Sequence, residues 1–290
     1  MSMDANLVRR VGFAAVAIPL ALVLVWYGGF PLALLLAVAG ALGAAELFDL
    51  AARQNVRALR PLGMASAAGL PLLVYAAVTD PGLRNWVSGW WPYLAALWLI
   101  GLLSWVLLIR PPSERPLSAA AITLLTVAYT GGFPAFLLAI RHTQYSVRSW
   151  SGAWLVFFPL VVTWVCDTAA MFGGRAFGGP KLAPLVSPGK TQSGSTAGLF
   201  AGLLVGLLFA LLIFPRTAVE VPLWQLLVIA GVLSVVGQIG DLVESLFKRE
   251  AGVKDSSNLI PGHGGVLDRF DSLYFVIPTA AALYRAFGVI

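Results

Sequence analysis

The feature that most constrains this chain is a series of long apolar runs separated by short polar segments. A helix needs about 20 apolar residues to cross the hydrocarbon core of a bilayer. Nine runs of roughly this length occur, at residues 11–28, 31–52, 63–79, 91–109, 118–140, 153–173, 194–214, 222–247 and 271–289. Charged residues make up only 11% of the 290 residues, against about 25% in a soluble domain. We therefore predict an all-α, polytopic membrane protein with about nine transmembrane helices.

Positive charge alternates along the segments that join these runs. Fourteen of the 19 Lys and Arg residues fall before the first run or in every second loop after it, whereas four fall in the other loops. Because cytoplasmic loops carry the excess of Lys and Arg, we place the N-terminus in the cytoplasm and the C-terminus outside. The predicted location is the cell membrane, with the sixth-to-seventh and eighth-to-ninth loops facing the cytoplasm.

The predicted helices fall into two regions. We expect residues 1–150 to form a transmembrane scaffold that makes lipid or dimer contacts, and residues 151–290 to form a catalytic transmembrane region with two cytoplasmic loops. The seventh run carries a glycine every four residues, at Gly194, Gly198, Gly202 and Gly206. Such a stripe is typical of helices that pack closely in membranes, which is the function we assign to it.

Acidic residues are concentrated between residues 238 and 271, where six of the 13 Asp and Glu residues lie. Charge inside or beside a membrane is costly, so this concentration indicates chemistry or a bound ion. The single cysteine, Cys166, excludes an internal disulfide and metal sites built on paired cysteines.

Four acidic side chains in this stretch are candidate metal ligands. Asp241 and Glu244 lie one helical turn apart near the end of the eighth run, and Asp268 and Asp271 repeat that spacing where the ninth run begins. Carboxylates brought together repel one another unless a cation separates them, and hard oxygen ligands suit Mg²⁺ or Mn²⁺. Capping of the ninth helix is an alternative for Asp268 and Asp271, but it does not explain Asp241, which lies near a helix C-terminus.

The other polar loop, residues 167–194, is rich in glycine and carries candidate ligands for a polyphosphate. These are Arg175, Lys181, Ser187, Lys190 and Thr191. The tripeptide at 189–191 is not part of a P-loop, because Pro184 stands where that motif has its first glycine and no strand is expected before it. A flexible loop with ordinary positive-inside charge is the alternative interpretation.

Further polar residues have two interpretations each. Asp167 lies late in the sixth run, where a carboxylate that faces lipid is costly. We therefore expect it to face the same cavity as the candidate metal and phosphate ligands; a hydrogen bond to a neighbouring helix is the alternative. His263 and Gly264 lie in a Pro-Gly-His-Gly-Gly loop that suits contact with phosphate, although a turn can also satisfy such a histidine through its backbone. We interpret Glu46 and Asp49 as ion-paired residues at the membrane surface without a catalytic role.

The C-terminal stretch resembles the signature of the phosphatidate cytidylyltransferases, also called CDP-diacylglycerol synthases. The matching residues are Ser245, Lys248, Arg249, Lys254, Asp255, His263, Gly264, Gly265, Asp268, Arg269 and Asp271. The loop at 167–191 resembles the other conserved loop of that family. Met171 and Ser193 depart from it, since the family usually has Tyr at the first position and Glu or Gln at the second.

The resemblance implies an enzyme that transfers the cytidylyl group of CTP to phosphatidate, giving CDP-diacylglycerol and pyrophosphate. It implies catalytic roles for Asp241, Asp268, Asp271, Lys248, Arg249, Lys254 and Arg269. CTP and its phosphates would be bound by Asp167, Arg175, Lys181, Ser187, Lys190, Thr191, His263 and Gly264. Asp241, Asp268, Asp271 and Glu244 would hold a two-cation Mg²⁺ site, with Mn²⁺ or a monovalent cation as alternatives.

We expect CTP, phosphatidate and the lipid bilayer as partners, and no nucleic acid; a homodimer is left open. A transporter is an alternative, but the polar residues gather on one membrane face rather than at mid-depth. A CDP-alcohol phosphotransferase is disfavoured because its Asp-x-x-Asp-Gly pattern is absent. A relative that acts on an ether-linked lipid stays open.

Overall fold

The computed structural model describes residues 2–260 and 264–290 and is almost entirely helical, as predicted. Its long helices are α1 (Ser2–Tyr27), α2 (Gly29–Ala52), α3 (Arg60–Thr79), α4 (Pro81–Ile109), α7 (Trp150–Phe177), α8 (Gln192–Leu208) and α9 (Leu223–Glu250). The shorter ones are α5 (Pro116–Thr126), α6 (Phe133–His142), α10 (Leu267–Phe270) and α11 (Leu273–Ala286). A π-helical segment, η2 (Val127–Gly132), joins α5 to α6 without a break.

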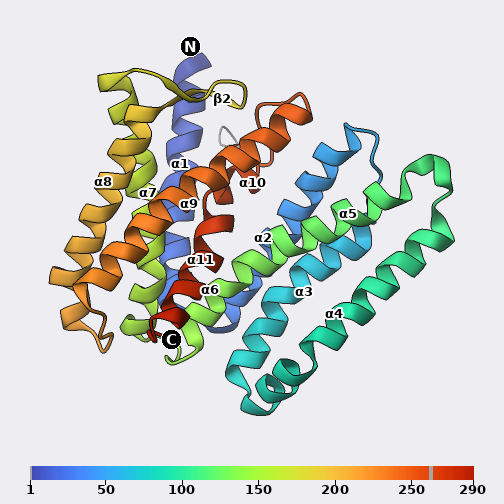
Figure 1. Cartoon of the computed structure of the whole chain (residues 1–290), viewed down its shortest axis with the longest axis horizontal. Coiled ribbons are helices and arrows are strands. Elements are labelled where there is room, and N and C mark those ends of the chain that lie inside the picture. Colours follow the sequence, from blue (N-terminus) through green and yellow to red (C-terminus); the bar gives the residue numbers. More distant parts are fainter. Residues whose placement is uncertain (1, 261–263) are drawn as a thin grey trace. The chain divides into compact units, whose positions relative to one another are not determined.

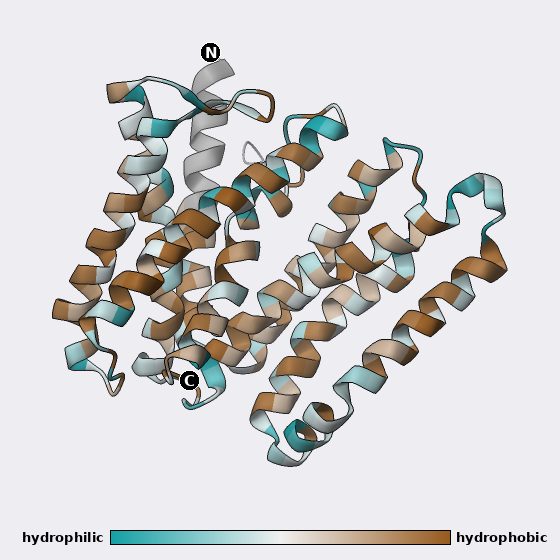
Figure 2. Cartoon of the chain, viewed as in Figure 1, coloured by the Kyte–Doolittle hydropathy of each residue, from teal (hydrophilic) through white to brown (hydrophobic). Residues whose placement is uncertain are grey.

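Each predicted apolar run coincides with a helix, and seven helical segments in the described residues are long and apolar enough to cross a membrane. The N-terminal helix has a shorter apolar part, Ala15–Tyr27, and α11 has 14 residues. The polytopic membrane architecture is therefore confirmed, while the count of nine spans and their orientation stay predictions. Hydrophobic residues follow the helices and hydrophilic residues gather in many of the connecting loops (Figure 2).

The chain divides into two compact units, each assembled from separate stretches. Unit 1 comprises the N-terminal stretch up to Ala17, Gly29–Ala139 and Glu250–Arg269. Unit 2 comprises Ile18–Gly28, Ile140–Arg249 and Phe270–Ile290. The sequence predicted a division at residue 150 between a scaffold region and a catalytic region. That division of roles stays a prediction.

In unit 1, α2 packs along α3 and against η2. The close approach depends on glycines, since a Cβ at Gly40 would lie 2.9 Å from the Ala67 carbonyl oxygen and 3.0 Å from that of Thr130. In unit 2, α7 and α8 lie side by side (Figure 1).

The glycine stripe of α8 is buried and serves helix packing, as predicted. A Cβ at Gly198 would lie 2.9 Å from the Cys166 sulfur on α7, and a Cβ at Gly202 would collide with the Ser234 hydroxyl on α9. The stripe therefore brings both neighbouring helices of unit 2 against α8.

The polar loop after α7 contains the one pair of strands in the described residues, β1 (Lys181–Ala183) and β2 (Ser187–Thr191). They are antiparallel, and Lys181 faces Thr191 while Ala183 faces Ser187. The turn between them closes with a 3.2 Å hydrogen bond from the Val186 N–H to the Ala183 carbonyl. Pro184 stands at the second position of this turn, where its fixed φ is favoured. The flexible loop considered from the sequence is thus a hairpin.

We expect Gly198→Ala to destabilise the protein by about 1–3 kcal/mol, because the added methyl group overpacks the contact with Cys166. Thermal unfolding in detergent measures the effect. Gly101→Ala on α4 is the matched control, since a Cβ there meets nothing within 4 Å. Equal melting temperatures for the two variants would contradict the packing role.

Candidate functional site

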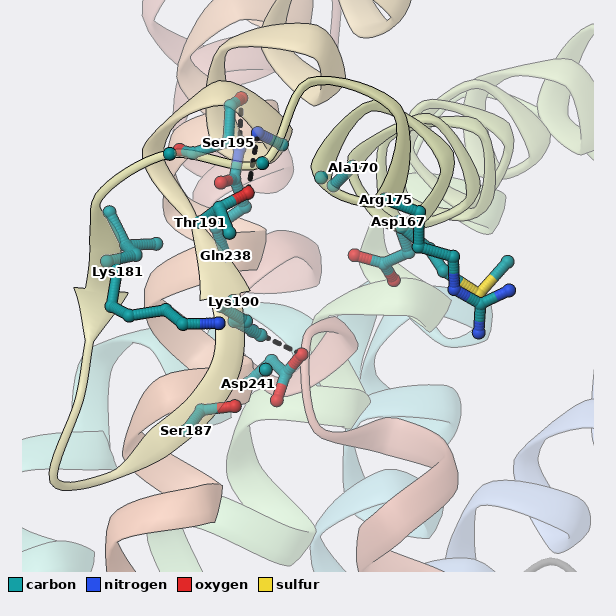
Figure 3. A pocket seen from close by; sticks show the side chains of 17 residues that line it. Asp167, Ala170, Arg175, Lys181, Ser187, Lys190, Thr191, Ser195, Gln238 and Asp241 are labelled. Atoms are coloured by element: carbon teal, nitrogen blue, oxygen red, sulfur yellow. Dashed lines mark hydrogen bonds and ion pairs between the residues drawn. The ribbon is translucent and has the colours of Figure 1, made fainter.

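Unit 2 contains a cavity of about 660 Å³ between the hairpin, α7, α8 and α9. Seven of the residues predicted for the site line it together: Asp167, Arg175, Lys181, Ser187, Lys190, Thr191 and Asp241. Figure 3 shows the carboxylate of Asp167 pointing into this space, while the guanidinium of Arg175 extends away from Lys190. Met171, one of the departures from the family pattern, also lines the cavity.

The hairpin is held at its base by the start of α8. The Thr191 hydroxyl accepts a 3.1 Å hydrogen bond from the Gly194 N–H and so caps α8. The Ser193 hydroxyl donates to the carbonyl of Gly178, just after α7. Ser193, the second departure from the family pattern, therefore ties the loop after α7 to the start of α8.

The turn of the hairpin is held by α9. Arg249 Nε donates a 3.2 Å hydrogen bond to the Val186 carbonyl. The catalytic role predicted for Arg249 stays a prediction; its position also suits holding the hairpin over the cavity.

Lys190 and Asp241 form the central ion pair of the cavity, with Nζ and Oδ2 2.5 Å apart (Figure 3). Both side chains are about one-quarter exposed. The Ser245 hydroxyl, one turn along α9, lies 3.4 Å from Asp241 Oδ1. A β2 lysine therefore balances an α9 carboxylate at the point where the two elements meet.

Gln238 is a cavity residue that the sequence analysis missed. Its Nε2 donates to the Ser234 carbonyl at 3.1 Å and to the Ser195 carbonyl at 3.3 Å, so it joins α9 to α8. The available signal was an amide side chain far inside an apolar run, three residues before Asp241.

Asp271 lies between α10 and α11, outside the helices long enough to span a membrane. Burial and the negative charge of Asp241 raise its pKa to about 6, although the Ser272 N–H, Lys248 and Lys190 act in the opposite direction. The charge of Asp167 also interacts with those of Asp241 and Asp271. In unit 2, three carboxylates therefore lie near enough for their charges to repel one another.

The chemistry of this group suits a hard divalent cation, because its donors are carboxylate oxygens whose negative charge is incompletely balanced. As placed, no three His, Cys, Asp or Glu side chains in the described part of the chain converge closely enough to hold one ion. Of the predicted ligands, unit 2 contains Asp241, Glu244 and Asp271, and metal binding there stays a prediction.

Glu244 and Lys248 form a salt bridge one turn apart on α9. Glu244 is 1% exposed and does not line the cavity. This salt bridge does not bear on the roles predicted for the two residues. Glu244 as a metal ligand and Lys248 as a catalytic residue stay predictions.

Asp268 belongs to unit 1, where one of its oxygens is tightly held. Its Oδ2 accepts hydrogen bonds from the N–H groups of Ser256 at 2.9 Å and Gly265 at 2.8 Å. The Ser256 hydroxyl lies 2.8 Å from the same oxygen. That Asp268 shares a metal site with Asp241 and Asp271 stays a prediction.

The remaining predicted residues are spread along the same stretch of unit 1. Lys254 and Arg269 are exposed. Gly264 has a φ of +80°, a conformation that favours glycine. His263 lies outside the described residues.

The interpretation of Glu46 and Asp49 as ion-paired surface residues is wrong for Glu46. Glu46 is 4% exposed, and its carboxylate accepts hydrogen bonds from the stretch 256–267. Asp49 does form an ion pair, with Arg60. The Glu46 contacts were missed because they join positions more than 200 residues apart, which no local pattern reveals.

A model of the cytidylyltransferase family matches residues 8–287. The chain belongs to the cytidylyltransferase family. This confirms the family and enzyme class that the two loops predicted.

Curated relatives named phosphatidate cytidylyltransferase are similar to this cytidylyltransferase. The one from Staphylococcus saprophyticus is 41% identical over 159 residues, which cover 55% of this chain and 56% of the relative. The one from Staphylococcus haemolyticus is 42% identical over 160 residues, with the same coverage. The one from Haemophilus influenzae is 36% identical over 201 residues, which cover 65% of this chain and 68% of the relative. The matched part therefore spans little more than half the length of the staphylococcal proteins.

We expect Thr191→Val to lower the stability of this cytidylyltransferase by about 1 kcal/mol, because it removes the oxygen that caps α8 while keeping the side-chain volume. Thr191→Ser keeps the oxygen and serves as the control. The melting temperature in detergent should fall for the valine variant alone; a similar fall in both would contradict the capping role.

Proposed function

We propose that the chain transfers the cytidylyl group of CTP to phosphatidate, giving CDP-diacylglycerol and pyrophosphate on the cytoplasmic face of the membrane. The observation that carries the proposal is the unit 2 cavity, where Lys181, Ser187, Lys190 and Thr191 line one space with Asp167 and Asp241. Its volume of about 660 Å³ falls within the range of small-molecule sites. Membership of the cytidylyltransferase family and the names of the relatives support the same reaction.

The β2 strand supplies groups suited to the triphosphate of CTP. The Lys190 ammonium and the hydroxyl of Ser187 face the cavity beside Lys181. A point charge and neutral donors on a short strand orient a polyphosphate without demanding a P-loop. When CTP enters, Lys190 can exchange part of its contact with Asp241 for phosphate oxygens.

The reaction needs no protein nucleophile, because the phosphate of phosphatidate already carries nucleophilic oxygens. One such oxygen attacks the α-phosphorus of CTP and forms the new P–O bond as the bond to pyrophosphate breaks in line with it. The protein brings two anions together and orients them, which is where catalysis by positioning and electrostatics acts.

We propose Mg²⁺ as the cofactor, held by Asp241 and Asp271 together with Asp268. When bound, a divalent cation screens the two anions and stabilises the leaving pyrophosphate. The raised pKa of Asp271 supports this proposal, since burial and the negative charge of Asp241 both disfavour the ionised carboxylate and a bound cation offsets both effects. We further propose that the lipid phosphate and pyrophosphate are contacted by Lys248, Arg249, Lys254 and Arg269.

The reaction is tested directly in membranes that overexpress the chain. We expect CTP labelled at the α-phosphorus to enter the lipid fraction only when phosphatidate is present, and EDTA to abolish the incorporation until Mg²⁺ is restored. Lipid labelling that needs no phosphatidate, or none above control membranes, would contradict the proposal.

We expect Asp268→Asn to lower the turnover by at least about 100-fold, more than the loss typical of a residue that only orients a ligand. Glu250→Gln is the control, because Glu250 is an exposed acid in the same stretch. Activity in the asparagine variant close to that of the control would remove Asp268 from the site.

We expect the Mg²⁺ concentration for half-maximal activity to rise as the pH falls below about 6. The Asp271 carboxyl is neutral below its pKa of about 6 and ionised above it, so protons compete with the cation on the acidic side. Titrations of activity with Mg²⁺ at pH 5.5 and pH 7.5 measure the shift. Asp271→Asn should reduce this pH dependence, and an equal Mg²⁺ requirement at both pH values would argue against Asp271 as a ligand.

A further inference from the structure

The stretch of unit 1 formed by residues 256–260 and 264–267 closes around the carboxylate of Glu46, which comes from α2. Glu46 Oε1 accepts from the Ser257 hydroxyl at 2.7 Å and the Val266 N–H at 2.9 Å. Glu46 Oε2 lies 3.0 Å from the Ser256 hydroxyl and accepts from the Leu267 N–H at 2.8 Å. Both oxygens thus join the beginning of the stretch to its end.

We propose that Glu46 is a positioning residue that orders residues 256–260 and 264–267 and thereby orients Asp268 for the reaction. The ordering of the stretch is independent of the proposed function, whereas the consequence for catalysis rests on it. No motif of the sequence includes Glu46, which precedes this stretch by more than 200 residues.

The first step of the argument is the link between the two carboxylates. The Ser256 hydroxyl lies 3.0 Å from Glu46 Oε2 and 2.8 Å from Asp268 Oδ2. A hydroxyl has one proton to donate, so these two buried oxygens share a single donor. Movement of the Glu46 carboxylate therefore changes the hydrogen bonding of Asp268 directly.

The second step is the backbone of the same stretch. The N–H groups of Val266 and Leu267 point to Glu46, while those of Ser256 and Gly265 point to Asp268. Four backbone donors from the two ends of the stretch are thus aimed at two carboxylates. The Ile260 N–H closes the middle by donating to the Gly264 carbonyl at 2.8 Å.

The third step is the absence of spare room. A Cβ at Gly265 would collide with the Ser256 hydroxyl and with both carboxylate oxygens of Glu46. A Cβ at Gly264 would lie 2.5 Å from Asp268 Oδ2. These adjacent glycines let the backbone approach the two acids, so the glycine pair and Glu46 form one packed arrangement.

Glu46→Gln is the informative substitution because it keeps the size of the side chain. One carboxylate oxygen becomes an NH₂ group, which then faces a backbone N–H that has lost its acceptor, whereas the neighbouring serine hydroxyl can turn to accept from it. Asp49→Asn is the matched control, since Asp49 lies on the same helix and pairs with Arg60 outside this stretch.

Hydrogen exchange followed by mass spectrometry tests the ordering without any substrate. In Glu46→Gln, we expect one of the two amides, Val266 or Leu267, to exchange roughly tenfold faster, because glutamine keeps a single acceptor oxygen and one hydrogen bond is lost. Asp49→Asn should exchange like the unaltered protein. Unchanged protection of Val266 and Leu267 in Glu46→Gln would overturn the proposal.

Kinetics separate positioning from simple structural support. We expect Glu46→Gln to lower kcat by about 10–100-fold, the range typical of residues that orient a metal-binding group, while KM for CTP changes less than about twofold. Glu46→Asp keeps two acceptor oxygens and should recover part of kcat. A loss explained entirely by less folded protein, or unchanged kcat despite faster exchange, would overturn the positioning role.

Ser256→Ala provides a second variant if Glu46→Gln fails to fold. It removes the shared hydroxyl and keeps the backbone bonds, so we expect kcat to fall by roughly 2–10-fold; unchanged kcat would count against the link to Asp268. If the unaltered protein makes no lipid product from CTP and phosphatidate, the proposed function fails, while the exchange measurement still decides whether Glu46 orders the stretch.

Discussion

A carboxylate in an apolar protein must be given donors or positive charge, because an ionised group that loses water is costly. This constraint governs both units of the protein. In unit 1, Glu46 and Asp268 are surrounded by backbone N–H groups and serine hydroxyls. In unit 2, Asp241 faces Lys190 and Glu244 faces Lys248. For Asp271, burial and the negative charge of Asp241 outweigh the nearby donors and lysines, so its pKa stays raised to about 6 and added positive charge would be favourable there.

The site of unit 2 is built on close helix contacts. Gly198 and Gly202 allow α8 to touch α7 and α9 at the level of their backbones and small side chains. The Thr191 hydroxyl caps α8 and so fixes the end of the hairpin against the start of that helix. Arg249 on α9 holds the turn at the other end of the hairpin. Helix packing that looks purely structural is therefore what brings Lys190 to Asp241, and the proposed nucleotide site depends on it.

Local patterns predicted much of the candidate site and missed its supports. The residues of the loop 167–191 that we propose for phosphate binding were recognised because glycines, hydroxyls and cations lie close together in the sequence, and the structure gathers them around one cavity. The hairpin was missed because its strands are short and contain Pro188 and Gly189, which are poor strand residues. Glu46 was misassigned because nearby arginines offered a plausible partner, whereas its actual partners lie in the last 40 residues of the chain.

The sequence by itself determined that this chain is helical and suited to a membrane, and that it carries the two loops of the cytidylyltransferase family, since length, hydropathy and motif spacing are local properties. Only the tertiary structure decided which groups each acid meets. Asp241 meets a lysine, Asp268 meets backbone donors, and Glu46 meets a stretch far along the chain. The physical reason is that the partner of a charged group depends on which directions are left open after the helices have packed, and spacing along a sequence does not contain those directions.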